Sequence, residues 1–180
     1  SLKGPKHGGA NLMVNRQLKD ILKHVENPED DDEVREYLRR ILRKQAGDGS
    51  GLIYGMGHAV YSLSDPREVV FKGYVEQLAH EKGRDKDLAL YNKIEHMAPQ
   101  LIAEERKIFK GVSPNVDFYS GFVYGMMGIP EDLFTPLFVM ARTIGWLAHN
   151  IENKEYDGRI MRPATKYVGS VKQYVKMEDR

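Results

Sequence analysis

Apolar side chains recur along most of the chain three or four residues apart, which is the spacing of one face of an α-helix. The first stripe consists of Val14, Leu18, Ile21, Leu22 and Val25. A second stripe over 34–42 follows an acidic run at 29–33, and acidic side chains are favourable at a helix N-terminus. The pattern therefore predicts helices over 14–25 and 34–42.

Three further helices are predicted by the same spacing and by the residues that bound them. One runs over 66–82, with Pro66 at its first position and Gly83 as its stop. Another covers 91–102, with Pro99 as a kink or break. A third covers 116–127. Because no alternating pattern longer than four residues stands out, we expect an all-α fold.

The segment 131–151 differs from the others because it leaves almost no polar face. Phe138, Met140, Ile144 and Trp146 point to different sides of a helix here. A helix that is apolar on nearly all sides is normally buried on all sides. We therefore expect this chain to belong to a larger body.

Composition narrows the functional classes. The chain has 180 residues, and its 27 Lys and Arg nearly balance its 26 Asp and Glu, so it carries no electrostatic footprint for nucleic acid. It has no cysteine, which excludes disulfides, thiolate zinc sites and cysteine nucleophiles and makes a reducing cytosol the default. His24, His80, His96 and His149 lack the spacing to one another that metal ligands have. With no long apolar run and no signal-peptide pattern, we expect a soluble cytoplasmic protein without a metal or a membrane partner.

Three loops carry the candidate catalytic residues. His7 lies in GPKHGGAN (4–11), His58 in GMGHAVY (55–61) and Asp117 in SPNVDFYSG (113–121). A histidine near a helix N-terminus is favoured as a neutral donor. Two such donors and one carboxylate suit proton abstraction next to a carbonyl group. The alternatives stay open at this point: Asp117 as a plain helix cap, and both histidines as structural or solvated side chains.

Three arginines form a second set: Arg67, Arg142 and Arg162. Arg142 is the informative one, because Met140, Ala141 and Ile144 flank it and a buried guanidinium requires an anionic partner. Either a protein carboxylate or a bound dicarboxylate held by paired hydrogen bonds would supply that partner.

Five segments together resemble the successive signatures of the citrate synthase family. They are GPKHGGAN (4–11), GMGHAVYSLSDPR (55–67), PNVDFYSG (114–121), GIPEDLFTPLFVMARTIGWLAH (128–149) and RIMRP (159–163). They stand in the family's order and cover the chain from Gly4 to about Tyr167. The resemblance implies a helical small, catalytic domain over 1–122 and, over 123–180, C-terminal helices that belong to the large domain of an enzyme about twice as long.

The resemblance also implies roles for individual residues. Asp117 would take a methyl proton from acetyl-CoA, His7 would donate to the thioester oxygen, and His58 would donate to the carbonyl of oxaloacetate. Hydrolysis of citryl-CoA would then give citrate and CoA, with acetyl-CoA as a substrate and no cofactor. The carboxylates of oxaloacetate would be bound by Arg67, Arg142 and, across the interface of a homodimer, Arg162. The adenine of CoA would lie along Leu52, Ile53, Tyr54, Gly55, Met56 and Gly57.

Some alternatives remain within and beyond this family. A 2-methylcitrate synthase uses propionyl-CoA and differs by one methylene in an acyl pocket. A citryl-CoA lyase portion and a non-catalytic CoA-binding or oligomerisation module are the others. Ser62 departs from the family, since many members carry Lys or Arg there to meet a CoA phosphate. We expect this chain by itself to be weakly active or inactive, because closure of the domains around the substrate needs both of them.

Overall fold

The structure is a computed structural model, and it describes residues 8–61, 63–107, 111–156, 168 and 176–179. In these residues it consists of helices and loops, with no strand beyond one isolated bridge between Met56 and Pro114. The predicted all-α fold is confirmed. The helices are α1 (Ala10–His24), α2 (Asp31–Leu42), α3 (Pro66–Glu81), α4 (Asp85–Arg106), α5 (Val116–Met126) and α6 (Phe134–Glu155), with short 3₁₀ turns at Glu131–Leu133 and Met177–Asp179.

Side-chain caps explain where three of the helices begin. Asp30 accepts hydrogen bonds from the backbone N–H groups of Asp32 and Glu33 at the start of α2. Asp65 caps α3, whose first residue is Pro66, and Asn115 caps α5. Each side chain satisfies an N–H group that has no partner within its helix.

Pro99 lies inside α4, and the helix continues through it from Asp85 to Arg106. The predicted break is therefore absent. The flanking side chains Met97, Ala98, Leu101 and Ile102 are all buried in the core. This packing keeps the segment helical although proline supplies no N–H to the helix.

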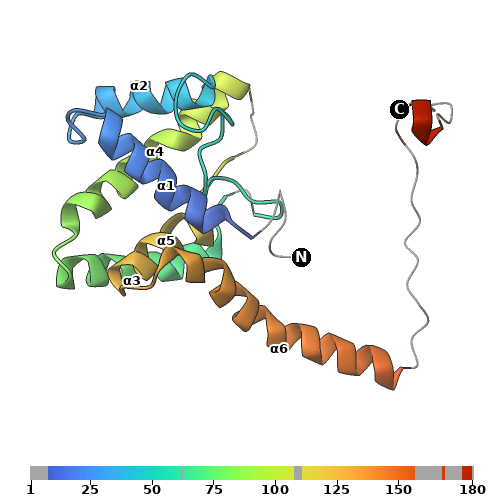
Figure 1. The fold of residues 1–180 in the computed structure, drawn as a ribbon. Coiled ribbons are helices and arrows are strands. Elements are labelled where there is room, and N and C mark those ends of the chain that lie inside the picture. Colours follow the sequence, from blue (N-terminus) through green and yellow to red (C-terminus); the bar gives the residue numbers. More distant parts are fainter. Residues whose placement is uncertain (1–7, 62, 108–110, 157–167, 169–175, 180) are drawn as a thin grey trace. The chain divides into compact units, whose positions relative to one another are not determined.

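Packing divides the chain into two units, residues 1–142 and residues 143–180. In the first unit α5 packs against both α1 and α3, while α4 packs against α2 and α3 (Figure 1). An aromatic group at the centre joins α4 to α5: the ring of Tyr91 stacks on Phe122 at 4.6 Å and meets the edge of Phe118 at 5.4 Å. The N-terminus of α5 is thereby fixed against the core.

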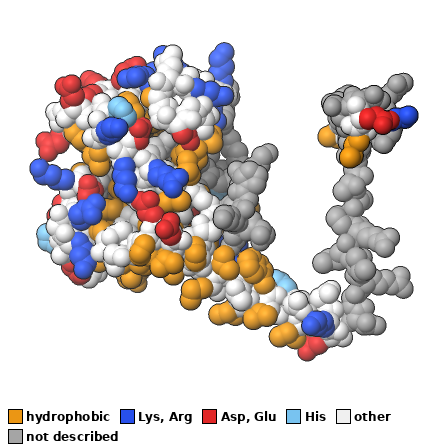
Figure 2. All heavy atoms as spheres, in the orientation of Figure 1, with side chains coloured by type: hydrophobic (Ala, Val, Ile, Leu, Met, Phe, Trp, Pro, Cys, Tyr) orange, Lys and Arg blue, Asp and Glu red, His pale blue; other side chains and the backbone are white. Residues whose placement is uncertain are grey.

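Helix α6 has a different environment. Phe134 is its one buried residue among those described, and many hydrophobic side chains lie exposed along the helix on the face seen in Figure 2. Met140 is 69% exposed and Ile144 is 76% exposed. The burial on all sides that the sequence predicts for this helix is therefore not provided by the described part of the chain.

Candidate active site

Two loops that are far apart in the sequence pair with each other beside the start of α5. The N–H of Gly57 donates to the carbonyl of Ser113 at 2.8 Å, and the N–H of Asn115 donates to the carbonyl of Gly55 at 2.9 Å. The side chain of Asn115 also donates to the carbonyl of Gly57 at 2.8 Å. This pairing brings the loop that carries His58 next to the helix that carries Asp117.

Two glycines allow the close approach of backbone that this arrangement needs. Gly55 has a φ of 78°, and a Cβ there would lie 2.8 Å from Cα of Phe118 on α5. Gly121, one turn beyond Asp117, would place a Cβ 2.7 Å from the carbonyl oxygen of Asn11 on α1. Side chains at either position would push α5 away from its neighbours.

The ring of His58 is oriented by the loop that follows it. Nδ1 accepts hydrogen bonds from the N–H groups of Val60 at 3.0 Å and Tyr61 at 3.2 Å. The ring also packs on that of Tyr61, with 4.8 Å between the centroids. Because Nδ1 serves as an acceptor, the hydrogen of the neutral ring lies on Nε2, and His58 presents Nε2–H as a donor.

Asp65 joins this loop to the starts of two helices. Its fully buried carboxylate accepts two hydrogen bonds from the guanidinium of Arg67, at 3.0 Å from Nε and 2.8 Å from Nη2. It also accepts the N–H of Val116 on α5 at 3.3 Å. These bonds lower the pKa of Asp65 to about 2, and the bonds from the guanidinium of Arg67 contribute most. Asp65 therefore remains an anion that fixes Arg67 and the start of α5 together.

Arg67 lies between the two loops. Its Nη2 is 3.4 Å from Nε2 of His58; since Nε2 carries the ring hydrogen, this is a contact rather than a hydrogen bond. The pKa of Arg67 is raised, first by its hydrogen bonds to Asp65 and also by the negative charges of Asp65 and Asp117. A cation, a neutral donor and a carboxylate thus share one small region of the first unit.

Asp117 occupies the first turn of α5 but not its capping position. Asn115 is the cap, and its side chain accepts the N–H of Asp117 at 3.0 Å. The interpretation of Asp117 as a plain helix cap is therefore wrong. The Asp117 side chain is half-buried in the first turn of the helix, where the helix dipole favours a carboxylate.

The other predicted site residues lie elsewhere or outside the described residues. Arg142 lies on α6 about two turns from its start and is exposed. Its apolar flanks Met140, Ala141 and Ile144 are exposed as well, so the anionic partner expected for Arg142 stays a prediction. His7, Ser62 and Arg162 lie outside the described residues. Gly8, which follows His7, accepts a hydrogen bond from Oγ1 of Thr135 at 2.6 Å.

The segment expected to contact CoA is held by α1. Gln17 donates to the carbonyl of Leu52 at 2.8 Å and accepts the N–H of Tyr54 at 3.0 Å. Two of the backbone groups of this segment are thus already bonded within the chain. Ile53 is buried, and the hydroxyl of Tyr54 donates to Asp48 at 2.6 Å.

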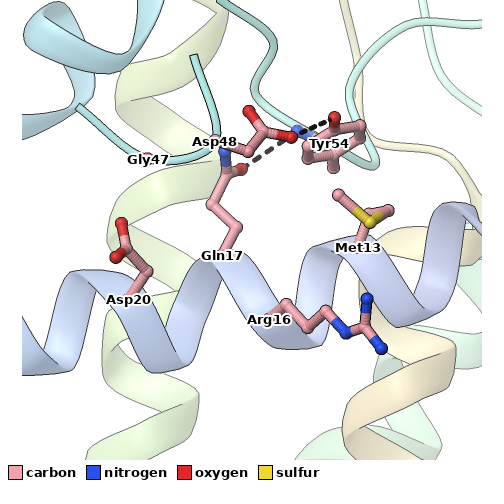
Figure 3. A pocket seen from close by; sticks show the side chains of 7 residues that line it. All are labelled: Met13, Arg16, Gln17, Asp20, Gly47, Asp48 and Tyr54. Carbon is pink, nitrogen blue, oxygen red and sulfur yellow. Dashed lines mark hydrogen bonds between the residues drawn. The ribbon is translucent and has the colours of Figure 1, made fainter. Parts of the chain in front are cut away.

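A pocket of about 320 Å³ opens beside this segment (Figure 3). It is lined by Met13, Arg16, Gln17, Asp20, Gly47, Asp48 and Tyr54. Figure 3 shows Gln17 reaching from α1 toward Asp48 and Tyr54, with Arg16 and Asp20 to either side. The pocket contains one cation, Arg16, and two carboxylates, and two of its side chains, Tyr54 and Asp48, are hydrogen-bonded to each other.

Two residues of this region escape sequence reasoning. In the sequence Asp65 is only a member of the segment GMGHAVYSLSDPR (55–67); an Asp before Pro at a helix start signals a cap, but not the burial and the bond from Val116. Gln17 gives no signal, because its partners lie more than thirty residues away along the chain.

The described residues contain no group of three or more His, Asp or Glu side chains placed to hold a metal ion. Among them, too, no helix is both long enough and apolar enough to cross a bilayer.

Comparison with known proteins gives a consistent result. The family model for the citrate synthase C-terminal domain matches residues 1–164. A citrate synthase of Synechocystis sp. is 39% identical over 100% of this chain, which spans 41% of that protein. A 2-methylcitrate synthase of Shewanella oneidensis is 37% identical over 94% of this chain, which covers 40% of it. The chain thus spans less than half the length of these relatives.

Solved structures agree with the sequence comparisons. The chain matches citrate synthase of the archaeon Thermoplasma acidophilum, determined as a ternary complex with carboxymethyl coenzyme A and oxaloacetate, with a TM-score of 0.70 and 32% identity. The match covers 99% of this chain and 44% of that one. With a family model that matches nearly the whole sequence and the same fold in a solved relative, the chain belongs to the citrate synthase family.

Proposed function

We propose that this chain is the catalytic C-terminal part of a citrate synthase, which condenses acetyl-CoA with oxaloacetate and hydrolyses citryl-CoA to citrate and CoA. The observation that carries the proposal is the convergence of His58, Arg67 and Asp117, through the pairing of residues 55–57 with residues 113–115. A donor, a cation and a carboxylate in one place are the groups that such a condensation requires.

The geometry suggests a role for each group. The carboxylate of Asp117 removes a proton from the methyl group of acetyl-CoA, and the resulting enolate carbon attacks the carbonyl carbon of oxaloacetate. Nε2–H of His58 donates to the carbonyl oxygen of oxaloacetate as that oxygen gains negative charge. Arg67, held by Asp65 at 2.8 Å, binds a carboxylate of oxaloacetate through its remaining donors. His7 lies outside the described residues, and its role as donor to the thioester oxygen of acetyl-CoA rests on the family signature GPKHGGAN alone.

The remaining parts of the proposal concern the longer protein. We assign residues 1–122 to its small domain and 123–180 to helices that join its large domain. Arg142 and Arg162 would complete the binding of oxaloacetate, Arg162 across a homodimer interface. The segment 52–57 would contact CoA, and a cytoplasmic location accords with a chain that has no cysteine.

A 2-methylcitrate synthase is the second candidate, favoured by the similarity to the Shewanella oneidensis protein at 37% identity. The two activities differ by one methylene of the acyl group, which a pocket distinguishes by about 1–3 kcal/mol. Comparing the turnover of acetyl-CoA and propionyl-CoA at equal concentrations decides between them. A preference for propionyl-CoA of about tenfold or more would favour the second candidate.

The test of the main proposal is release of CoA thiol from acetyl-CoA plus oxaloacetate by the longer protein that contains this chain, read with a disulfide dye. Asp117→Asn should lower the rate about 10²-fold or more, because a general base contributes that much. Asp132→Asn is the matched control, since Asp132 is exposed, and it should leave the rate unchanged. No thiol release with either acyl-CoA from the longer, unmutated protein would refute the proposal.

A further inference from the structure

A group of buried and half-buried polar side chains lies where α3, α4 and α5 meet, and it includes Glu68, the residue after Arg67. Glu68 on α3 is 3% exposed, and its Oε1 has no hydrogen-bond partner within the described structure. A buried polar atom without a partner is uncommon and costly, and a charged one is far more so. Glu68 therefore requires an explanation that the proposed reaction does not supply.

The neighbouring carboxylates are each matched by a cation. Asp65 is paired with Arg67 at 2.8 Å, and Glu95 on α4 is paired with Lys72 at 2.6 Å. The hydroxyl of Tyr119 on α5 also donates to Oε2 of Glu95, at 2.6 Å. Within the described parts of the chain, three carboxyl groups thus share two cations, and Glu68 is the one without an ion pair.

Burial and most of the charges around Glu68 raise the pKa of its carboxyl group. Burial raises its pKa most, the negative charge of Glu95 raises it further, Lys72 opposes both, and Asp65 adds a smaller rise. Together they raise the pKa of Glu68 to about 7. Burial, assisted by the hydrogen bond to Glu95, raises the pKa of Tyr119 far above its usual range, so this hydroxyl stays neutral.

We propose that Glu68 is a proton-binding site of this junction, a neutral carboxylic acid when the proton is bound and an unpaired buried anion when it is lost. Loss of the proton places a third negative charge beside those of Asp65 and Glu95, at the start of the helix that carries Arg67. The N-terminus of α3 is then less stable. If the proposed function holds, the position of Arg67, and with it the binding of oxaloacetate, depends on this proton.

The first test is the pH dependence of unfolding of the chain, measured by denaturant titration from about pH 5 to about pH 9. The unfolded chain releases this proton near the ordinary value of 4.5, while the folded chain keeps it until about 7. The folded state thus binds more protons in that range, and stability falls as the pH rises. Glu68→Gln, which keeps the shape of the neutral acid, removes this fall and lowers the unfolding constant at about pH 8 by ~10²-fold.

Glu76→Gln is the matched control, because Glu76 is on the same helix and is exposed. It should keep the pH profile of the unmutated chain. Parallel profiles for the unmutated chain and Glu68→Gln would overturn the proposal, as would an equal flattening by Glu76→Gln.

Infrared spectroscopy provides a second readout that does not depend on unfolding. A carbonyl band of a protonated carboxylic acid should be present at about pH 6, disappear by about pH 9 and be absent in Glu68→Gln. Glu95→Gln removes a neighbouring negative charge, so the midpoint for loss of the band should move to lower pH. Persistence of the band in Glu68→Gln, or a midpoint that Glu95→Gln leaves unchanged, would contradict the assignment. Neither readout uses a substrate, so failure of the proposed enzymatic function leaves both tests intact.

Discussion

Helices α5 and α6 are both rich in apolar side chains, yet their environments in the structure are opposite. On α5, Phe118 is 1% exposed and Tyr119 is fully buried, between α1 and α3. On α6, Ile144 is 76% exposed and Leu147 is 57% exposed. An apolar helix pattern therefore indicates that a helix needs a partner, but it does not identify the partner or place it within the same chain.

The contrast matters for the candidate site. Asp117 lies on the buried helix, whose start is fixed by Asn115 and by the bond from Val116 to Asp65. Arg142 lies on the exposed helix and is itself exposed. Among the described residues, no contact orients its side chain toward that site. The candidate site residue on the packed helix is thus held in place, and the one on the exposed helix is not. Precise positioning requires packed, rigid elements.

The largest expected difference between the two helices is in the cost of removing an aromatic side chain. Phe118→Ala should lower the free energy of unfolding by about 3–5 kcal/mol, because it leaves a cavity in the core. Trp146 on α6 is 45% exposed, and Trp146→Ala should change that free energy by no more than about 0.5 kcal/mol. Denaturant titration of both variants measures the comparison. Equal costs would mean that α6 is packed in solution as firmly as α5.

Glycines give a finer version of the same comparison. Gly121→Ala on α5 should cost about 1–3 kcal/mol, since the added methyl group would meet the carbonyl oxygen of Asn11 at 2.7 Å. Gly125 on α5 and Gly145 on α6 have open space at that position. Alanine at either of them should be neutral or stabilise the helix, by up to about 1 kcal/mol. Thermal unfolding of the three variants would contradict this account of α5 if Gly121→Ala were as stable as the other two.

Most of the fold could be predicted from the sequence, because the signals for a helix and for its ends lie within the helix and the residues that flank it. The periodicity predicts all six helices, five of them within about four residues of their bounds, while α4 starts six residues before the predicted 91. Pro66 and Gly83 mark the ends of α3 correctly. Pro99 shows the limit of this reasoning, since core packing on either side of it keeps α4 continuous. Local preference is weaker than tertiary packing at such a position.

The sequence could predict which residues belong to the candidate site, but not how they are arranged in space. His58, Arg67 and Asp117 could be singled out by residue type and by their places in the family signatures. The pairing of residues 55–57 with residues 113–115 could not, because a long-range backbone contact leaves no periodic trace in the sequence. The buried role of Asp65 needed the same contact, since one of its hydrogen bonds comes from Val116 on α5.

Removal of that buried carboxylate should have an intermediate effect with a definite pH dependence. The pKa of Asp65 is lowered from 3.8 to about 2, so its contribution is present above about pH 4 and lost as the pH falls toward 2. Asp65→Asn should therefore cost about 2 kcal/mol of unfolding free energy at neutral pH. The difference from the unmutated chain should shrink at about pH 2. A difference that stayed constant from neutral to acid pH would show that charge is not what Asp65 contributes.

The smallest expected effect on stability belongs to the exposed stripe of α6, formed by Met140, Ile144, Leu147 and Ile151, each more than half exposed. The double variant Ile144→Lys, Leu147→Glu keeps the net charge and should change the unfolding free energy by no more than about 0.5 kcal/mol. Its effect should appear in association instead, because a contiguous apolar surface promotes contact between copies.

Light scattering at high concentration should give a mass above that of a monomer for the unmutated chain and a monomer mass for the double variant. Asn150→Lys, on the same helix and exposed, is the matched control and should associate like the unmutated chain. A monomeric unmutated chain would mean that the stripe is covered in solution by something within the chain itself. In that case α6 would resemble α5 after all, and Trp146→Ala should prove costly in the unfolding measurements.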